Sequence, residues 1–308
     1  MDADALPLNS YLDEWLTLLR TRVRPSTHAC YRRMLDAYVR PHIGGKDLAG
    51  LTTRQLDRLY VDLLTGGGRY GGRLSPRTVA HTHAVLHKAL ADAVAHGLLG
   101  ENVAGGAHVP KYDPDAEYRP DRQQYWDANE TRRFLDVTAD DPLQVLWRVA
   151  LATGMRRAEL LGLRWCDVDV PAGQIRVSTA LTEVDGKVRL GQTKTGRPRT
   201  LSLDTATQQQ LATLPQITDT EGYGLVFVRA DGSPWPPPQI SDRWRSQWPR
   251  LARLGVPRIS LHATRHVHAT LLLEQGVPIK VVSERLGHTT TAMTMDISAI
   301  TRPAVDGS

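Results

Sequence analysis

Basic and histidine side chains recur in the C-terminal two-thirds of the chain, in settings that suit binding of one phosphate. Arg156 follows a glycine turn in the sequence TGMRRAEL (153–160) and opens a predicted helix. A helix N-terminus beside a guanidinium group forms a ready site for an anion. Glu159, one turn further on, either orients a neighbouring arginine or is an ordinary surface acid.

Three later segments add positive charge and groups that transfer protons. Lys194 lies in QTKTGR (192–197), a predicted hairpin turn from which an ammonium group can project into a groove. His262 and Arg265 are three residues apart around a predicted helix start, so they can face one point, and His288 follows a short helix in LGH (286–288). Each segment is a weak signal alone, but together they indicate a phosphate-binding cluster.

The elements that must position this cluster are helices followed by a small meander and then more helices. Apolar spacing predicts helices near 130–138, 142–152, 156–163, 205–214, 239–253, 264–275 and 278–286. Short strands are predicted at 174–177, 188–190 and 199–203. This order favours the α+β class over a parallel sheet.

The first hundred residues predict a bundle of four short amphipathic helices. One apolar stripe follows a possible Ser10 cap, a second follows Thr27, and a third begins near Thr52. The fourth helix has the clearest start, with Ser75 as its cap and Pro76 at its first position.

Positive residues gather where the third helix of this bundle passes to the fourth. Such an edge either faces DNA phosphates or is a solvated charged surface. His83 and His87 on the fourth helix have the i, i+4 spacing of a metal pair, but they lack a carboxylate or thiol partner nearby, so no metal site is expected. The candidate DNA-binding residues are Arg69, Arg73, Arg77 and Lys88.

A segment rich in proline and glycine separates the two halves. We therefore expect a helical domain at residues 1–107, a linker at 108–122 and a second domain at 123–308. A chain of 308 residues is also more typical of two domains than of one.

Composition indicates an ordinary globular protein with a polyanionic partner. The formal net charge is +5, and the two cysteines, Cys30 and Cys166, are too far apart in sequence for a C-x-x-C site. No run of about 18 apolar residues and no signal peptide occurs, so we expect neither secretion nor a membrane partner. The expected location is the cytoplasm, in association with the nucleoid.

In this order, the four segments TGMRRAEL, QTKTGR, LHATRHVHAT (261–270) and LGH resemble those of the tyrosine recombinases, also called the phage integrase family. The resemblance extends from Leu8 to about Ile300. It implies a mainly helical α+β chain, with an N-terminal helical core-binding (SAM-like) bundle and an integrase-type catalytic domain carrying a small antiparallel sheet. It further implies site-specific recombination of double-stranded DNA in a mobile element. The expected assembly is a homotetramer on paired DNA sites, and an accessory directionality factor is a possible further partner.

Carried over to this chain, the resemblance gives each cluster residue a role. Arg156 and Arg265 would hold the non-bridging oxygens of the scissile phosphate, and Lys194 would protonate the departing 5′ oxygen. His262 would act in proton transfer, and His288 would donate a hydrogen bond to the phosphate. The chemistry implies neither a cofactor nor a metal ion.

The sequence departs from the family pattern at the nucleophile. A tyrosine is expected ten residues beyond His288, but Ser298 stands there, and the last tyrosine is Tyr223. An engineered substitution, natural decay and a true serine nucleophile all stay open as explanations. Because a serine hydroxyl is shorter and far less acidic than a phenol, we expect the chain as it stands to be inactive in cleavage. A second departure is Ala263, where family members commonly carry an acid.

Two rival functions follow from these departures and from the histidines. One is a catalytically inactive DNA-binding regulator of recombination on the same fold, which the missing tyrosine favours. The other is a metal-dependent nuclease built from His262, His266 and His268.

Overall fold

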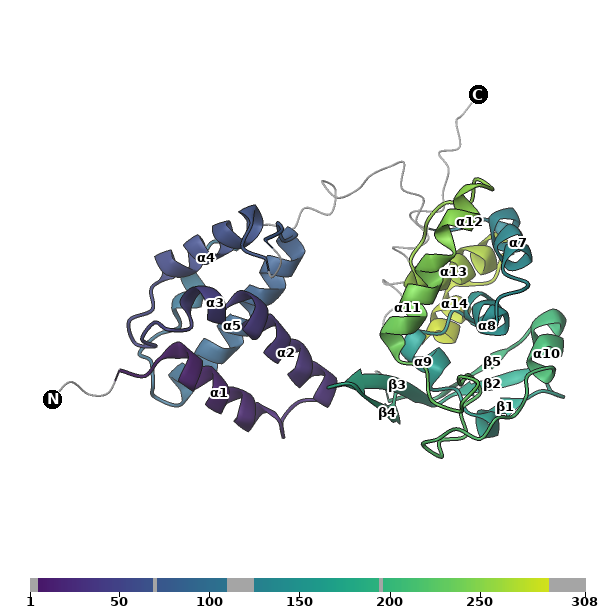
Figure 1. Ribbon diagram of the computed structural model, residues 1–308, viewed down its shortest axis with the longest axis horizontal. Helices are drawn as coiled ribbons and strands as arrows, with labels where there is room; N and C mark the ends of the chain where they lie inside the picture. The colour runs from purple at the N-terminus through teal and green to yellow at the C-terminus, as the bar shows by residue number, and fades with distance from the viewer. Residues whose placement is uncertain (1–4, 69–70, 110–124, 194–195, 288–308) are drawn as a thin grey trace, which may run out of the picture. The chain divides into compact units, whose positions relative to one another are not determined.

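A computed structural model describes residues 5–68, 71–109, 125–193 and 196–287. The chain divides into two compact units, residues 1–119 and 120–308 (Figure 1). Each unit contains its own hydrophobic core. The predicted linker at 108–122 lies mostly outside the described residues, so the domain boundaries stay predictions. Among the described helices, none combines the length and apolar character needed to cross a membrane.

The N-terminal unit is helical throughout its described part. Its helices are α1 (Leu8–Leu19), α2 (Pro25–Tyr38), α3 (Arg40–Ile43), α4 (Thr53–Thr65) and α5 (Pro76–Ala95), followed by the 3-10 turn η1 (Val103–Gly106). The predicted start of α5 is confirmed, because the Ser75 hydroxyl accepts a hydrogen bond from the Thr78 backbone and Pro76 opens the helix.

Two helix starts in this unit differ from the prediction. The first helix begins at Leu8 rather than after Ser10, since Leu8 is fully buried and its backbone donates to the Lys46 carbonyl. The second begins at Pro25 rather than after Thr27, because proline is well suited to the first turn, where its missing N–H costs nothing.

In the described part of the C-terminal unit, eight helices surround short strands. The helices are α7 (Ala128–Val137), α8 (Gln144–Thr153), α9 (Arg157–Leu161), α10 (Thr205–Ala212), α11 (Pro237–Ser246), α12 (Trp248–Ala252), α13 (Thr264–Glu274) and α14 (Ile279–Leu286), with 3-10 turns η2 (Trp165–Asp167) and η3 (Leu261–Ala263). The single helix predicted at 239–253 is wrong. It is divided into α11 and α12 because Pro249 cannot donate a helical hydrogen bond.

Two small antiparallel sheets complete the unit. Strands β1 (Val168–Asp169), β2 (Gln174–Val177) and β5 (Arg199–Ser202) form one sheet in the order β1-β2-β5. Strands β3 (Thr179–Val184) and β4 (Lys187–Gln192) form the other. The mainly helical α+β class is therefore confirmed.

The strand pairing corrects the predicted setting of Lys194. The strand before it, β4, pairs with β3, whereas the strand after it, β5, pairs with β2. The segment between β4 and β5 therefore connects two sheets and is not a hairpin turn. Lys194 itself lies outside the described residues.

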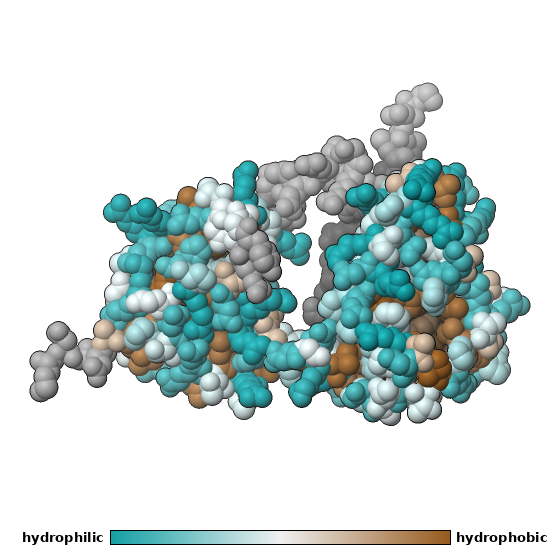
Figure 2. Space-filling model, viewed as in Figure 1, coloured by the Kyte–Doolittle hydropathy of each residue, from teal (hydrophilic) through white to brown (hydrophobic). Residues whose placement is uncertain are grey.

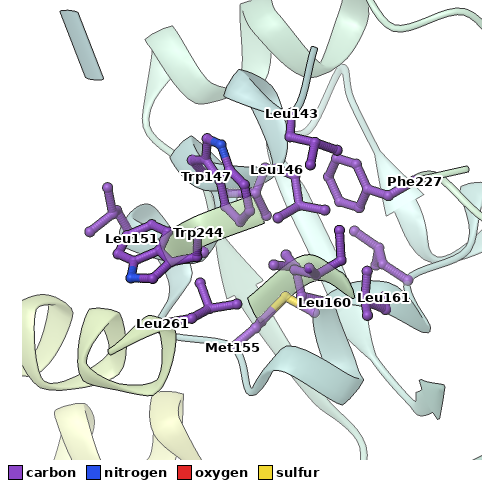
Figure 3. Packing of buried hydrophobic residues seen from close by; sticks show 14 of the residues in the cluster. Leu143, Leu146, Trp147, Leu151, Met155, Leu160, Leu161, Phe227, Trp244 and Leu261 are labelled. Atoms are coloured by element: carbon purple, nitrogen blue, oxygen red, sulfur yellow. The ribbon is translucent and has the colours of Figure 1, made fainter. Parts of the chain in front are cut away.

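An aromatic cluster holds the C-terminal core together. The Trp244 ring lies 4.7 Å from that of Phe134, 5.3 Å from that of Trp147 and 5.6 Å from that of Trp126, measured between centroids. Figure 3 shows Trp147 and Trp244 among the leucines of the same core. The indole nitrogen of Trp244 also donates to the Ile259 carbonyl at 2.8 Å, which ties α11 to the segment before α13.

Replacing Trp244 by alanine is expected to destabilise the C-terminal unit strongly. The residue is 1% exposed, and truncation of a buried tryptophan costs about 3–5 kcal/mol of unfolding free energy. Chemical denaturation followed by tryptophan fluorescence measures this loss. Leu254→Ala is the control, because Leu254 is 48% exposed. Equal losses in the two variants would contradict the central place of Trp244 in the core.

Candidate active site

Gly154 turns the chain between α8 and α9 and brings Arg156 to the site. Its φ of 60° is in the left-handed region, and an added Cβ would lie only 2.7 Å from the Leu286 side chain. Arg156 is the N-cap residue of α9, with its own backbone N–H bonded to Glu159 Oε2 at 3.0 Å. Helix α9 has only five residues, and the carboxylate already accepts from the N-cap backbone N–H, so the anion site expected at this helix N-terminus stays a prediction. The structure shows positive charge supplied here by side chains.

Glu159 is a buried carboxylate shared by two arginines. It is 1% exposed, which excludes the ordinary surface acid that was one interpretation of the sequence. Its Oε1 accepts from Arg156 Nη1 at 2.8 Å and from Arg199 Nη1 at 3.3 Å, and its Oε2 accepts from Arg199 Nη2 at 2.7 Å. Burial alone would raise the Glu159 pKa, but the hydrogen bonds and charges of Arg199 and Arg156 outweigh it and hold the pKa below its usual value.

Arg265 is the most deeply buried cation of the cluster. It is 3% exposed, donates from Nη1 to the Gly154 carbonyl at 2.9 Å, and donates from Nη2 to the Leu286 carbonyl. Burial, and then the charge of Arg156, lower its pKa to about 9. Among the described residues, Arg156, Arg199 and Arg265 thus place three positive charges around the negative charge of Glu159. An anion at this point would neutralise the excess.

His262 lies beside these arginines, in η3 at the start of α13. Its pKa is lowered first by desolvation of the ring and then by the charges of Arg265, Arg156 and Arg157. The imidazole is therefore mostly neutral near pH 7 and can take or release a proton. Its ring centroid lies 5.9 Å from that of His266.

Three predicted site residues, Lys194, His288 and Ser298, lie outside the described residues. The residue before His288 is nevertheless part of the site. Gly287 ends α14 in the left-handed region, and its carbonyl accepts from Arg156 Nη2 at 3.3 Å. The structure therefore brings together Arg156, Glu159, His262 and Arg265, as the sequence predicted.

The sequence interpretation missed Arg199, although the strand pattern contained a signal for it. In β5, Leu201 is fully buried while Thr200 and Ser202 are exposed. Alternation along a strand puts Arg199 on the same face as Leu201. A charged residue on the buried face of a strand requires a buried partner, and here that partner is Glu159.

The residues of the predicted DNA-binding edge in the N-terminal unit differ in exposure and pairing. Arg73 and Arg77 are exposed, and Arg73 Nε also donates to the Leu64 carbonyl at 3.3 Å. Lys88 forms an ion pair with Asp92 at 3.7 Å, which reduces the charge it offers to DNA. Arg69 lies outside the described residues.

The metal-site alternative finds no support in the described part of the chain. No three His, Cys, Asp or Glu side chains gather there as a possible metal site. His268, one member of that alternative, is 6% exposed and packs against Gly154. His83 has a tyrosine partner, the hydroxyl of Tyr60, 2.9 Å from its Nδ1 atom.

Family models match both units of the chain. The model described as "Phage integrase family" matches residues 124–298, and the one described as "Phage integrase, N-terminal SAM-like domain" matches residues 8–64. Tyrosine recombinase XerD of Mycobacterium tuberculosis is 29% identical, over 96% of this chain and 94% of the relative. A tyrosine recombinase XerC-like protein of Caldanaerobacter subterraneus is 25% identical, over 96% and 80%.

Solved structures share the fold. A lambda integrase tetramer bound to a Holliday junction matches with a TM-score of 0.74 at 18% identity, over 99% of this chain and 81% of that one. The Tn1549 transposon integrase in complex with transposon right end DNA matches with a TM-score of 0.74 at 19% identity, over 94% of both chains. The predicted resemblance and the SAM-like N-terminal fold are confirmed.

The burial of His268 predicts a loss of stability in mild acid. Burial, and then the charge of Arg285, lower its pKa to about 4 from 6.5, so the unfolded chain binds a proton in this range that the folded chain does not. Stability is therefore full above pH 6.5 and falls as the pH approaches 4. Because one pKa unit corresponds to about 1.4 kcal/mol, the shift at His268 accounts for roughly 3 kcal/mol of unfolding free energy.

Urea unfolding at pH 7 and at pH 4.5 measures this contribution. The difference in unfolding free energy between the two values is expected to be smaller in His268→Gln than in the unaltered chain. An equal difference in both proteins would show that His268 does not titrate in this way.

Proposed function

The chain belongs to the phage integrase family, and we propose that it is a site-specific DNA recombinase by fold and site. It binds duplex core sites and carries the groups for cleaving and rejoining DNA strands there, with the cleavage step blocked in the chain as it stands. The observation that carries the proposal is the group of Arg156, Arg199 and Arg265 around Glu159, which among the described residues sets three positive charges against one negative charge. A transferring phosphoryl group gains charge in its transition state, and fixed guanidinium groups stabilise that charge without moving.

In the proposed reaction, Arg156 and Arg265 bind the non-bridging oxygens of the scissile phosphate. Both guanidinium groups are held by protein acceptors, Glu159 for Arg156 and the Gly154 carbonyl for Arg265, so they are oriented before DNA arrives. Lys194 protonates the departing 5′ oxygen, His262 transfers a proton, and His288 donates a hydrogen bond to the phosphate. These roles rest on the family resemblance and on the position of Gly287 beside Arg156.

DNA binding is proposed to involve both units. Arg73 and Arg77 are exposed on the N-terminal unit. On the C-terminal unit, the surface over α11 and α12 is largely hydrophilic in Figure 2. The exposed arginines of this part of the chain include Arg243, Arg253 and Arg258. Arg245 and Arg250 are also exposed, but they form ion pairs with Asp242 and Asp140. We propose that the two units hold a duplex together in the cell's nucleoid, with four protomers on two sites and an accessory factor that sets direction.

Ser298 decides between recombination and the competing function of a DNA-binding regulator. We propose that the chain as it stands binds its site without forming the covalent 3′-phosphate link, because an aliphatic hydroxyl is shorter and harder to ionise than a phenol, whose pKa is about 10.

A nicked suicide duplex carrying the chain's own core site tests this proposal. The unaltered chain is expected to give no covalent adduct, and Ser298→Tyr is expected to give one that survives denaturing electrophoresis. An adduct from the unaltered chain that disappears in Ser298→Ala would identify serine as the nucleophile. Specific binding without cleavage by Ser298→Tyr would instead favour the regulator.

Alanine at Arg73 or Arg77 is expected to weaken DNA binding by a similar factor on every sequence, because contacts to phosphates carry no base information. Each substitution should also make the slope of log affinity against log salt shallower by about one. Fluorescence anisotropy over a salt series measures both effects. Lys46→Ala, an exposed substitution between α3 and α4, is the control. Unchanged slopes would remove this edge from the DNA-binding surface.

A further inference from the structure

The end of α14 is capped by three arginines that come from three different elements. The carbonyl oxygens of residues 285, 286 and 287 accept in turn from Arg199 Nε at 2.7 Å, from Arg265 Nη2, and from Arg156 Nη2 at 3.3 Å. The last carbonyls of a helix have no partner within it, and its C-terminus attracts cations. Two of the three arginines are the proposed phosphate ligands, and the third, Arg199, has no role in the carried-over family pattern.

Arg199 is also the second partner of the carboxylate that orients Arg156. Its Nη2 donates to Glu159 Oε2 at 2.7 Å, and its Nη1 donates to Glu159 Oε1 at 3.3 Å, while Arg156 Nη1 uses the same Oε1. The Arg199 side chain is only 10% exposed. Each of its three guanidinium nitrogens therefore donates a hydrogen bond to a protein acceptor, and the group is poorly placed to bind DNA itself.

Gly287 makes this arrangement possible. Its φ of 64° lies in the left-handed region, and an added Cβ would lie 3.2 Å from Arg199 Cδ. The side chain of Arg199 thus passes close beneath the turn that precedes His288. One residue from β5 contacts both the carboxylate behind Arg156 and the end of α14.

We propose that Arg199 is a positioning residue for the scissile phosphate site, which it preorganises by fixing Arg156 through Glu159 and by fixing the end of α14. The proposal rests on the function proposed above. Arg199 does not touch the phosphate. Its removal takes away two of the four hydrogen bonds that described residues donate to the Glu159 carboxylate, so Arg156 is oriented less firmly and binds the phosphate less well.

The test measures phosphate contacts without needing a nucleophile. A core-site duplex is first recovered by selection from random-sequence DNA, and single neutral methylphosphonates are then placed at successive positions along each strand. The ratio of affinities for the charged and neutral duplexes reports how strongly each phosphate is held. Hydrogen bonds to charged groups contribute about 1.5–3 kcal/mol, so the scissile position should give a ratio of about tenfold or more.

Five proteins are compared at that position. The unaltered chain should show the full ratio, and Arg156→Ala should lose most of it. The ratio of Arg199→Ala should fall to within about threefold of the ratio of Arg156→Ala. The ratio of Arg199→Lys should fall only in part, because an ammonium group keeps the charge but cannot reach both acceptors at once. The matched control is Arg176→Ala, an exposed arginine on the neighbouring strand β2 whose register partner is Thr200.

The double variant separates positioning from general destabilisation. If Arg199 acts through Arg156, adding Arg199→Ala to Arg156→Ala should not reduce the ratio further. An effect independent of Arg156 would reduce it below that of Arg156→Ala alone. If Arg199→Ala does not fold, Arg199→Lys carries the same comparison, since it keeps the charge.

Two results have distinct meanings. A full ratio in Arg199→Ala, equal to that of Arg176→Ala, would overturn the positioning role. If no phosphate position gives a ratio that is lower in Arg156→Ala than in the unaltered chain, the proposed function is overturned, and the role of Arg199 with it.

Discussion

The site depends on one buried carboxylate. Glu159 is 1% exposed and receives hydrogen bonds from two guanidinium groups and from the Arg156 backbone. A buried charge is tolerable only when it is paired and hydrogen-bonded, and removing one partner of such a pair typically costs about 3–5 kcal/mol. The same contacts that make Glu159 tolerable fix the direction of Arg156. Stability of the core and preparation of the site are therefore achieved by the same atoms.

Two left-handed glycines allow the arginines to approach this point. Gly154 offers its carbonyl to Arg265, and Gly287 offers its carbonyl to Arg156. A side chain at either glycine would meet neighbouring atoms, those of Leu286 and His268 at Gly154 and those of Arg199 at Gly287. Desolvation, and then the charges of neighbouring arginines, lower the pKa of Arg265 and of His262.

Local signals in the sequence predicted what local chemistry determines. The start of α5 followed from Ser75 and Pro76, and the members Arg156, His262 and Arg265 followed from family spacing. Arg199 was missed because its partner Glu159 is 40 residues away, and only the folded chain brings a strand to that carboxylate. Strand β3 was missed because its two buried residues, Ala180 and Leu181, are adjacent and do not alternate. The division of α11 from α12 was readable in Pro249, but the apolar spacing obscured it.

The central claim is that the arginines around Glu159 hold one DNA phosphate. A crystal structure of the chain on its own core-site duplex tests this most directly. We expect one phosphate whose non-bridging oxygens accept hydrogen bonds from Arg156 and Arg265, with Glu159 still held by Arg156 and Arg199. A bound duplex with no phosphate within hydrogen-bonding distance of either Arg156 or Arg265 would contradict it.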